Sequence, residues 1–218
     1  MTHKIEINNH IFILHTSGAI YWPKHRALLI ADVHLGKVSH FRKHGIGIPS
    51  QALHKNFDEL DKVVSYFEAE KIWFLGDLFH SVQNIEWLRF EDWCKDCPTE
   101  IILIAGNHDI IQDWQYEEIG VKMVEEMIVD GFLLTHFPTE REGLFVFAGH
   151  IHPGIKIRGV GRQSEILACF FRTENQIILP AFGAFTGKHI VKAKIGDIAY
   201  AIAGDEIIEI EKQQKVKE

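Results

Sequence analysis

The sequence has no long uncharged apolar stretch, so it lacks a candidate membrane-spanning helix. Its first residues, Met-Thr-His-Lys-Ile-Glu-Ile, lack the apolar core of a secretion signal. It also has no internal repeat and no linker rich in proline and serine. These absences predict a cytoplasmic protein with a single domain over residues 1–218, in which the charged segment 211–218 frays.

Cysteine is scarce, with three residues in 218. Cys94 and Cys97 form a Cys-x-x-Cys, but a zinc knuckle needs a second pair, which the sequence lacks. The pair also falls near the end of a predicted helix, whereas thioredoxin-like chemistry needs it at a helix start. We therefore expect Cys94, Cys97 and Cys169 to be reduced structural thiols.

Two common nucleotide-binding motifs are incomplete. The segment from Gly183 to Lys188 is one residue too short for a P-loop and is followed by His189 instead of Ser or Thr. Gly159-Val-Gly161 lacks the third glycine of a dinucleotide fingerprint. We interpret both as turns, although Gly183 to Lys188 could border a substrate.

The formal net charge of −7 at first disfavours a nucleic-acid partner. However, residues 51–130 hold 18 acidic and 6 basic side chains, so the rest of the chain carries a net charge of +5. The acidity belongs mostly to one predicted helical region, and it does not exclude a phosphate-rich substrate.

Five apolar runs each end abruptly in polar side chains of metal-binding type. Short apolar runs that stop at Gly or Asp are typical of strands buried on both faces. In open sheets covered by helices, ligands bind beyond the carboxyl ends of the strands. The runs end at Asp32-Val-His34, Asp77, Asn107-His108-Asp109, His136 and His150-Ile-His152. Such a mixture of oxygen and imidazole ligands suits divalent first-row metals.

The spacing of these residues adds detail. Asp32 and His34 are two apart, as are His150 and His152. Side chains two apart on an extended segment point the same way, so each pair should reach one cluster. A lone Asp after a strand usually caps a turn, but five such ends in one chain are hard to explain in that way. These residues offer more potential ligands than one ion needs, which favours two ions that share a carboxylate.

The first half of the chain alternates predicted strands with helices, and the half after residue 120 is nearly all strand. We therefore expect an α/β fold of two facing mixed β-sheets, a β-sandwich flanked by α-helices. A helix over 50–69 has an apolar stripe for the core. A second helix over about 85–95 follows Asn84 as N-cap, and we expect Ile85, Leu88 and Trp93 to be its core contacts.

The loop 35–49 is rich in cationic side chains, and two interpretations of it remain open. It is either a solvated surface loop or a phosphate-facing flap, since it begins one residue after His34 and carries an arginine able to bind phosphate in bidentate fashion. Its basic and imidazole residues are Lys37, His40, Arg42, Lys43 and His44. His80, in another loop, either lines the site or is a surface histidine.

In their order, Asp-x-His, Gly-Asp, Gly-Asn-His-Asp, a lone His after a strand and Gly-His-x-His resemble the motifs of the calcineurin-like metallophosphoesterases. The set covers positions 32–152. The stretches 30–49 and 179–187 are similar to a narrower group, the bacterial ligase-associated metallophosphoesterases called PdeM, which are endonucleases assigned to the DNA damage response. The resemblance implies the four-layer architecture of that superfamily.

The resemblance also implies a role for each residue that matches a motif. Asp32, His34 and His152 would bind one ion, Asn107, His136 and His150 a second, and Asp77 would bridge them. The pair of ions would produce a bridging hydroxide as nucleophile and neutralise phosphate charge. The counterpart of His108 contacts the phosphate or protonates the leaving oxygen, and Asp109 or Asp32 could keep it cationic. The ligand set fits Mn²⁺, Fe or Zn, and the nuclease resemblance favours Mn²⁺.

The resemblance therefore predicts a two-metal phosphodiesterase acting on DNA, an endonuclease in repair, with Lys37, Arg42 and Lys43 binding substrate. DNA ligase and a helicase are the implied functional partners, and an edge strand of the second half could support a homodimer. The alternatives are a small-molecule phosphoesterase acting on nucleotides or phosphomonoesters, and a non-catalytic scaffold. The intact set of ligand residues argues against the scaffold.

Overall fold

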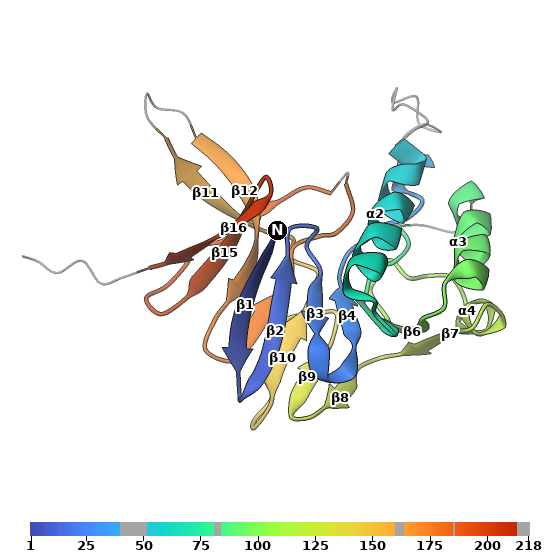
Figure 1. Cartoon of the computed structure of the whole chain (residues 1–218), viewed down its shortest axis with the longest axis horizontal. Helices are drawn as coiled ribbons and strands as arrows, with labels where there is room; N and C mark the ends of the chain where they lie inside the picture. Colours follow the sequence, from blue (N-terminus) through green and yellow to red (C-terminus); the bar gives the residue numbers. More distant parts are fainter. Residues whose placement is uncertain (40–51, 81–83, 160–163, 185, 213–218) are drawn as a thin grey trace, which may run out of the picture.

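The computed structural model describes residues 1–39, 52–80, 84–159, 164–184 and 186–212. Two mixed β-sheets of seven and nine strands face each other, with helices beside the first (Figure 1). This confirms the predicted α/β fold of two facing sheets. The first sheet runs β1 (Thr2–Ile7), β2 (His10–His15), β3 (Ile20–Trp22), β4 (Ala27–Ile30), β5 (Lys71–Leu75), β6 (Glu100–Ile104) and β7 (Val121–Val124), with a 3-10 turn η1 (Pro23–His25) before β4.

The second sheet takes its strands from the second half of the chain. Its order is β14-β11-β12-β13-β10-β9-β8, and a hairpin of β15 and β16 joins it through β12. The bounds are β8 (Met127–Val129), β9 (Phe132–Leu134), β10 (Phe145–Ala148), β11 (Pro153–Arg158), β12 (Ser164–Arg172), β13 (Gln176–Ile178), β14 (His189–Ile190), β15 (Ile198–Ala203) and β16 (Glu206–Glu211). Arg42 and Lys43, with the tail 213–218, lie outside the described residues.

The core between the sheets is aromatic and aliphatic. Phe12 and Trp22 of the first sheet pack against Phe132 of the second, with ring centroids 5.2 and 5.1 Å from its ring. Both sheets contribute to this core. A single domain over residues 1–218 stays a prediction. None of the described helices is long and apolar enough to cross a membrane.

The central strands of both sheets are parallel, and this positions the site. β4, β5 and β6 pair in parallel, with Leu29 beside Trp73 and Trp73 beside Ile102. In the second sheet, β10 lies parallel to β9 and to β13. The residues of β4 are buried on both faces, as their continuous apolar sequence predicts. The carboxyl ends of these strands therefore meet at one rim of the sandwich.

The helices α2 (Ala52–Phe67), α3 (Ile85–Asp96) and α4 (Asp113–Glu118) cover the outer face of the first sheet (Figure 1). Asn84 is the N-cap of α3, as predicted, because its Oδ1 accepts from the Glu86 amide at 2.8 Å. In the second sheet, the outer face carries an apolar cluster shared by β11, β12 and β15.

The predicted core contacts of α3 were wrong in part. Ile85 and Leu88 are more than half exposed, at 53% and 54%, while Trp87 and Phe90 are buried. The rings of Trp87 and Phe90 lie 5.3 and 5.4 Å from the ring of Phe79. Aromatic rings bury more area than aliphatic side chains, so this pair determines which face of the helix turns inward.

Candidate metal centre

The strand ends bring the predicted ligand residues together in two neighbouring groups. The first contains Asp32, His34 and His152, and the second contains Asp77, His136 and His150. Within each group, one potential ligand atom per residue lies within 4.8 Å of the others. Each group therefore offers the carboxylate and imidazole atoms that a divalent cation binds.

Asp77 belongs to the second group but also faces the first. Its Oδ2 is 3.9 Å from His34 Nε2, and its Oδ1 is 3.5 Å from His136 Nε2. Asn107 Oδ1 is 3.2 Å from the same nitrogen of His136, which adds an oxygen to the second group. A carboxylate in this position can be shared by two ions.

Backbone amides hold the ligand side chains in place. His150 N donates to Asp32 Oδ2 at 2.9 Å, and His108 N donates to Asp77 Oδ1 at 2.9 Å. His136 Nδ1 is 2.9 Å from the carbonyl of Leu75, to which it can donate, and this leaves Nε2 facing the site. Such contacts orient ligands and select the imidazole tautomer.

One buried carboxylate oxygen indicates that a cation binds at the first group. Asp32 is fully buried, and its Oδ1 has no hydrogen-bond partner among the described residues, although it lies 3.3 Å from His152 Nε2. A buried carboxylate oxygen without a donor is costly unless a positive charge neutralises it. The donor set and this atom therefore fit a divalent ion.

The backbone conformation that brings the ligand residues together differs from the extended one predicted from the sequence. The segments 32–34 and 150–152 are not extended, because Asp32, His34, His150 and His152 all have left-handed φ angles, between 51° and 69°. Asp77 does too, at 52°. Left-handed backbone costs about 1–2 kcal/mol at each non-glycine residue. The His150 and His152 side chains also separate, one to each group. Strained backbone of this kind concentrates at functional sites.

Glycines before the ligands permit close approach. A Cβ on Gly106 would lie 2.3 Å from both the amide nitrogen and Oδ1 of Asp77. A Cβ on Gly76, whose φ is +82°, would lie 2.2 Å from His136 Nδ1. Glycine is therefore required at both positions for the groups to come together.

Burial keeps two of the imidazoles neutral. It lowers the pKa of His34 to about 2, with Lys37 and neighbouring histidines acting in the same direction. Burial also lowers the pKa of His150, and His136 adds to this effect. Only neutral imidazole binds a metal ion, so both side chains are poised as ligands at neutral pH.

Two histidines stand beside the groups. The His108 ring lies 5.6 Å from that of His34, and it stacks on the His80 ring at 5.0 Å. His80 therefore lies in the site and is not a surface loop histidine. The two carboxylates considered as partners for His108 make other contacts. Asp109 accepts from the amides of Phe79 and Gly106, and Asp32 from that of His150.

Asp109 organises the loop that carries Asn107 and His108. It is 8% exposed, and its two oxygens accept at 3.0 Å from Phe79 N and at 2.9 Å from Gly106 N. Burial raises the pKa of this carboxyl to about 6, against the effect of the two backbone donors.

Lys37 is the predicted substrate-binding residue that the structure describes. It is half-buried; burial lowers the pKa of its ammonium, whereas Asp32 and Asp77 act to raise it. The cation is thus within electrostatic reach of one carboxylate from each group.

Two buried polar residues that hold the site were missed from the sequence. Glu86 is 2% exposed and accepts from Gly36 N at 2.7 Å and from Ser39 Oγ at 2.8 Å. Asn56 donates to the Val33 carbonyl and accepts from Ala184 N, both at 3.2 Å. Glu86 lies four residues before the buried Phe90 of its helix, and Asn56 lies four residues before the buried Leu60 of its own. Each polar residue is therefore on the apolar face of its helix. That placement was the available signal.

Phe182 and Gly183 pack against the strand end of the first group. Phe182 N donates to the Ala31 carbonyl at 2.9 Å, and Gly183 N donates to that of Asp32 at 3.1 Å. A Cβ on Gly183 would lie 2.3 Å from the Val33 carbonyl oxygen. Gly183 therefore supports the strand end that bears Asp32.

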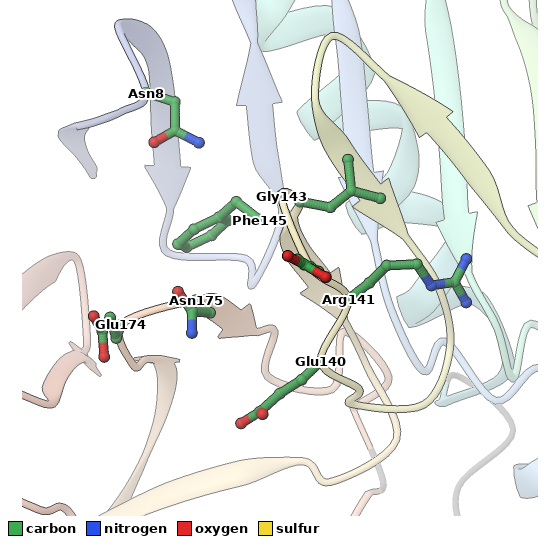
Figure 2. A pocket seen from close by; sticks show the side chains of 9 residues that line it. Asn8, Glu140, Arg141, Gly143, Phe145, Glu174 and Asn175 are labelled. Atoms are coloured by element: carbon green, nitrogen blue, oxygen red, sulfur yellow. The ribbon is translucent and has the colours of Figure 1, made fainter.

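A separate pocket of about 460 Å³ lies at the opposite end of β10 (Figure 2). Phe145, which begins that strand, lines it together with Glu140, Glu142 and Glu174. Arg141 is held by Glu126 in a bidentate pair at 2.7 and 3.0 Å. The pocket is acidic and contains none of the ligand residues, so it does not suit a phosphodiester.

The fold and the paired ligand groups define a metal-dependent phosphoesterase. The chain belongs to the calcineurin-like phosphoesterase family, whose sequence pattern matches residues 25–206. The crystal structure of the nuclease MPE from Pseudomonas putida is similar, with a TM-score of 0.79 and 28% sequence identity over 96% of this chain and 100% of that one. A protein of unknown function from Aquifex aeolicus matches more distantly, with a TM-score of 0.41 and 18% identity over 58% of this chain and 78% of that one. A search of curated proteins gives no match.

Proposed function

We propose that this protein is a two-metal phosphodiesterase that cleaves the backbone of DNA, an endonuclease acting in repair. The observation that carries the proposal is the placement of Asp77 between two ligand groups, with His34 Nε2 and His136 Nε2 on its two sides. The nuclease named among the similar structures supports nucleic acid as the substrate. DNA ligase and a helicase would be its functional partners.

The roles follow the two groups. Asp32, His34 and His152 would hold one ion, His136, His150 and Asn107 the other, and Asp77 would be shared. Mn²⁺ is the proposed metal. When bound, two such ions lower the pKa of a water molecule, which can then act as the nucleophile, and they neutralise phosphate charge.

The remaining residues act on the substrate. His108, partly exposed beside His34, would contact the phosphate and give a proton to the leaving oxygen. Lys37 would attract the phosphate to the site by its charge. Arg42 and Lys43 would bind phosphates of the DNA backbone, so that binding weakens as salt rises.

A substrate panel tests this proposal. Single-stranded DNA, duplex DNA, nucleotides and bis-p-nitrophenyl phosphate are compared with Mn²⁺ at one concentration, with the His108→Ala enzyme alongside. DNA cleavage should exceed nucleotide hydrolysis, and His108→Ala should reduce it by about 10²–10⁴. Hydrolysis of nucleotides or phosphomonoesters without DNA cleavage would favour a small-molecule phosphoesterase, the alternative that the acidic net charge and small size of the chain favour. Absence of any Mn²⁺-dependent hydrolysis would contradict both.

A further inference from the structure

An exposed aromatic ring lies at the rim of the second ligand group. Phe137 follows His136 directly and is 47% exposed. Its ring centroid lies 4.7 Å from that of His136 and 4.6 Å from that of His150. Phe137 is therefore open to solvent in part while its ring contacts two proposed metal ligands.

The position of Phe137, more than its exposure, is informative. Single exposed apolar residues are common on protein surfaces. Among the described residues, Tyr66, Trp114 and Phe137 are the large aromatic side chains that are exposed. Of these, Phe137 alone makes ring contacts with ligand histidines; the recorded contacts of Tyr66 are with His15 and Phe67.

The ring is also held in a restricted conformation. Pro138 follows it, and proline disfavours helical backbone at the residue before it, which narrows the conformations open to Phe137. The planes of the His136 and His150 rings are inclined to that of Phe137 at 74° and 59°, and both rings pack against it. A ring held in this way loses little entropy when a second flat group packs on it.

A nucleobase is the flat group that the site would bring there. If a phosphodiester of DNA sits at the ligand groups, the bases on either side of that phosphate fall at the rim. Bases of single strands stack on aromatic side chains with little regard to sequence, and each such contact contributes about 5- to 150-fold in affinity. A base held in a duplex has both faces covered by its neighbours and is not free to do so.

We propose that Phe137 is a stacking platform for a base next to the scissile phosphate. This rests on the proposed DNA cleavage and adds a contact to a base. The contact needs no hydrogen bond to the base edge, so it recognises a base without selecting sequence.

The test compares two oligomers of equal length and charge, oligo(dT) and a tetrahydrofuran abasic strand, each cleaved with Mn²⁺. Wild type should favour oligo(dT) in kcat/KM by about 5- to 150-fold. Phe137→Ala should reduce this preference to near unity, and Phe137→Tyr should restore it. Tyr66→Ala, an exposed aromatic at the far end of α2, should keep the wild-type ratio. Thermal unfolding and Mn²⁺ content confirm that each variant is folded and loaded.

Three results would overturn the proposal: no base preference in wild type, an unchanged preference in Phe137→Ala, or an equal loss on both oligomers and on bis-p-nitrophenyl phosphate. The last would mean that Phe137 only shields the histidines from water. A wild-type enzyme that hydrolyses bis-p-nitrophenyl phosphate but neither oligomer would instead refute the proposed DNA function, and the stacking role with it.

Discussion

Replacing Glu86 tests how the site is supported from a distance. Its carboxylate is buried and accepts from Gly36 N at 2.7 Å, from Ser39 Oγ at 2.8 Å and from Ser39 N at 3.3 Å. These bonds tie α3 to the segment that follows His34 and carries Lys37. We predict that Glu86→Ala and Glu86→Gln both destabilise the fold and weaken catalysis.

The magnitude follows from the bonds lost. Hydrogen bonds to a charged group each contribute about 1.5–3 kcal/mol, and the long one to Ser39 N contributes least. Glu86→Ala leaves all three donors without this acceptor, which should cost about 3–5 kcal/mol of unfolding free energy. Glu86→Gln keeps one oxygen, but its amide nitrogen then faces a donor from either Gly36 or Ser39. Its cost should be about 1.5–3 kcal/mol.

Urea unfolding measures the stability of each variant, and Mn²⁺-dependent hydrolysis of bis-p-nitrophenyl phosphate measures its activity. Asp92→Asn is the matched control, because Asp92 lies on the same helix and its side chain is 76% exposed. It should change stability by no more than about 0.5 kcal/mol. The reasoning fails if Glu86→Ala unfolds within about 1 kcal/mol of wild type, or if a folded Glu86→Gln enzyme keeps full activity.

Further predictions concern the ligand groups and their surroundings. Gly183→Ala should cost about 1–3 kcal/mol by forcing a Cβ against the Val33 carbonyl, whereas Gly187→Ala meets nothing within 4 Å and should be neutral; similar unfolding midpoints for the two would contradict this. Asp77→Asn should lower Mn²⁺ content and abolish hydrolysis, and an active, fully loaded Asp77→Asn would exclude the shared-carboxylate role. In metal-free protein, the folded pKa of His34 near 2 lies below its ordinary 6.5, so stability is complete above pH 6.5 and falls by up to about 1.4 kcal/mol per pH unit below it. Urea unfolding at pH 7 and pH 5 should show a smaller loss in His34→Gln than in wild type, and equal losses would refute the assignment.

The sequence predicted the general arrangement well because apolar runs and polar ends follow simple rules. Continuous burial of β4 and the parallel pairing of β4, β5 and β6 explain why Asp32 and Asp77 emerge at one rim. The local backbone was not predictable in this way. Left-handed φ angles at Asp32 and His34 arise from packing against Gly76 and Asp77, whose carbonyls accept from their amides at 3.1 and 2.9 Å.

Polar contacts between residues far apart in the chain also could not be predicted from the sequence. Glu86 and Gly36 are 50 residues apart, and Asn56 and Ala184 are 128 apart. Helical spacing marks Glu86 and Asn56 as polar residues on apolar faces, but it does not identify their partners. The exposed Ile85 and Leu88 illustrate the same limit, since the aromatic cluster around Phe79 decides which face of α3 is buried.

Anomalous diffraction from crystals grown with Mn²⁺, recorded at the manganese edge, tests the shared metal centre most directly. We predict two peaks about 3.5–4 Å apart, one beside Asp32 and His34, the other beside His136 and His150, with the Asp77 carboxylate in contact with both. A single peak, or two peaks that Asp77 does not join, would contradict the account.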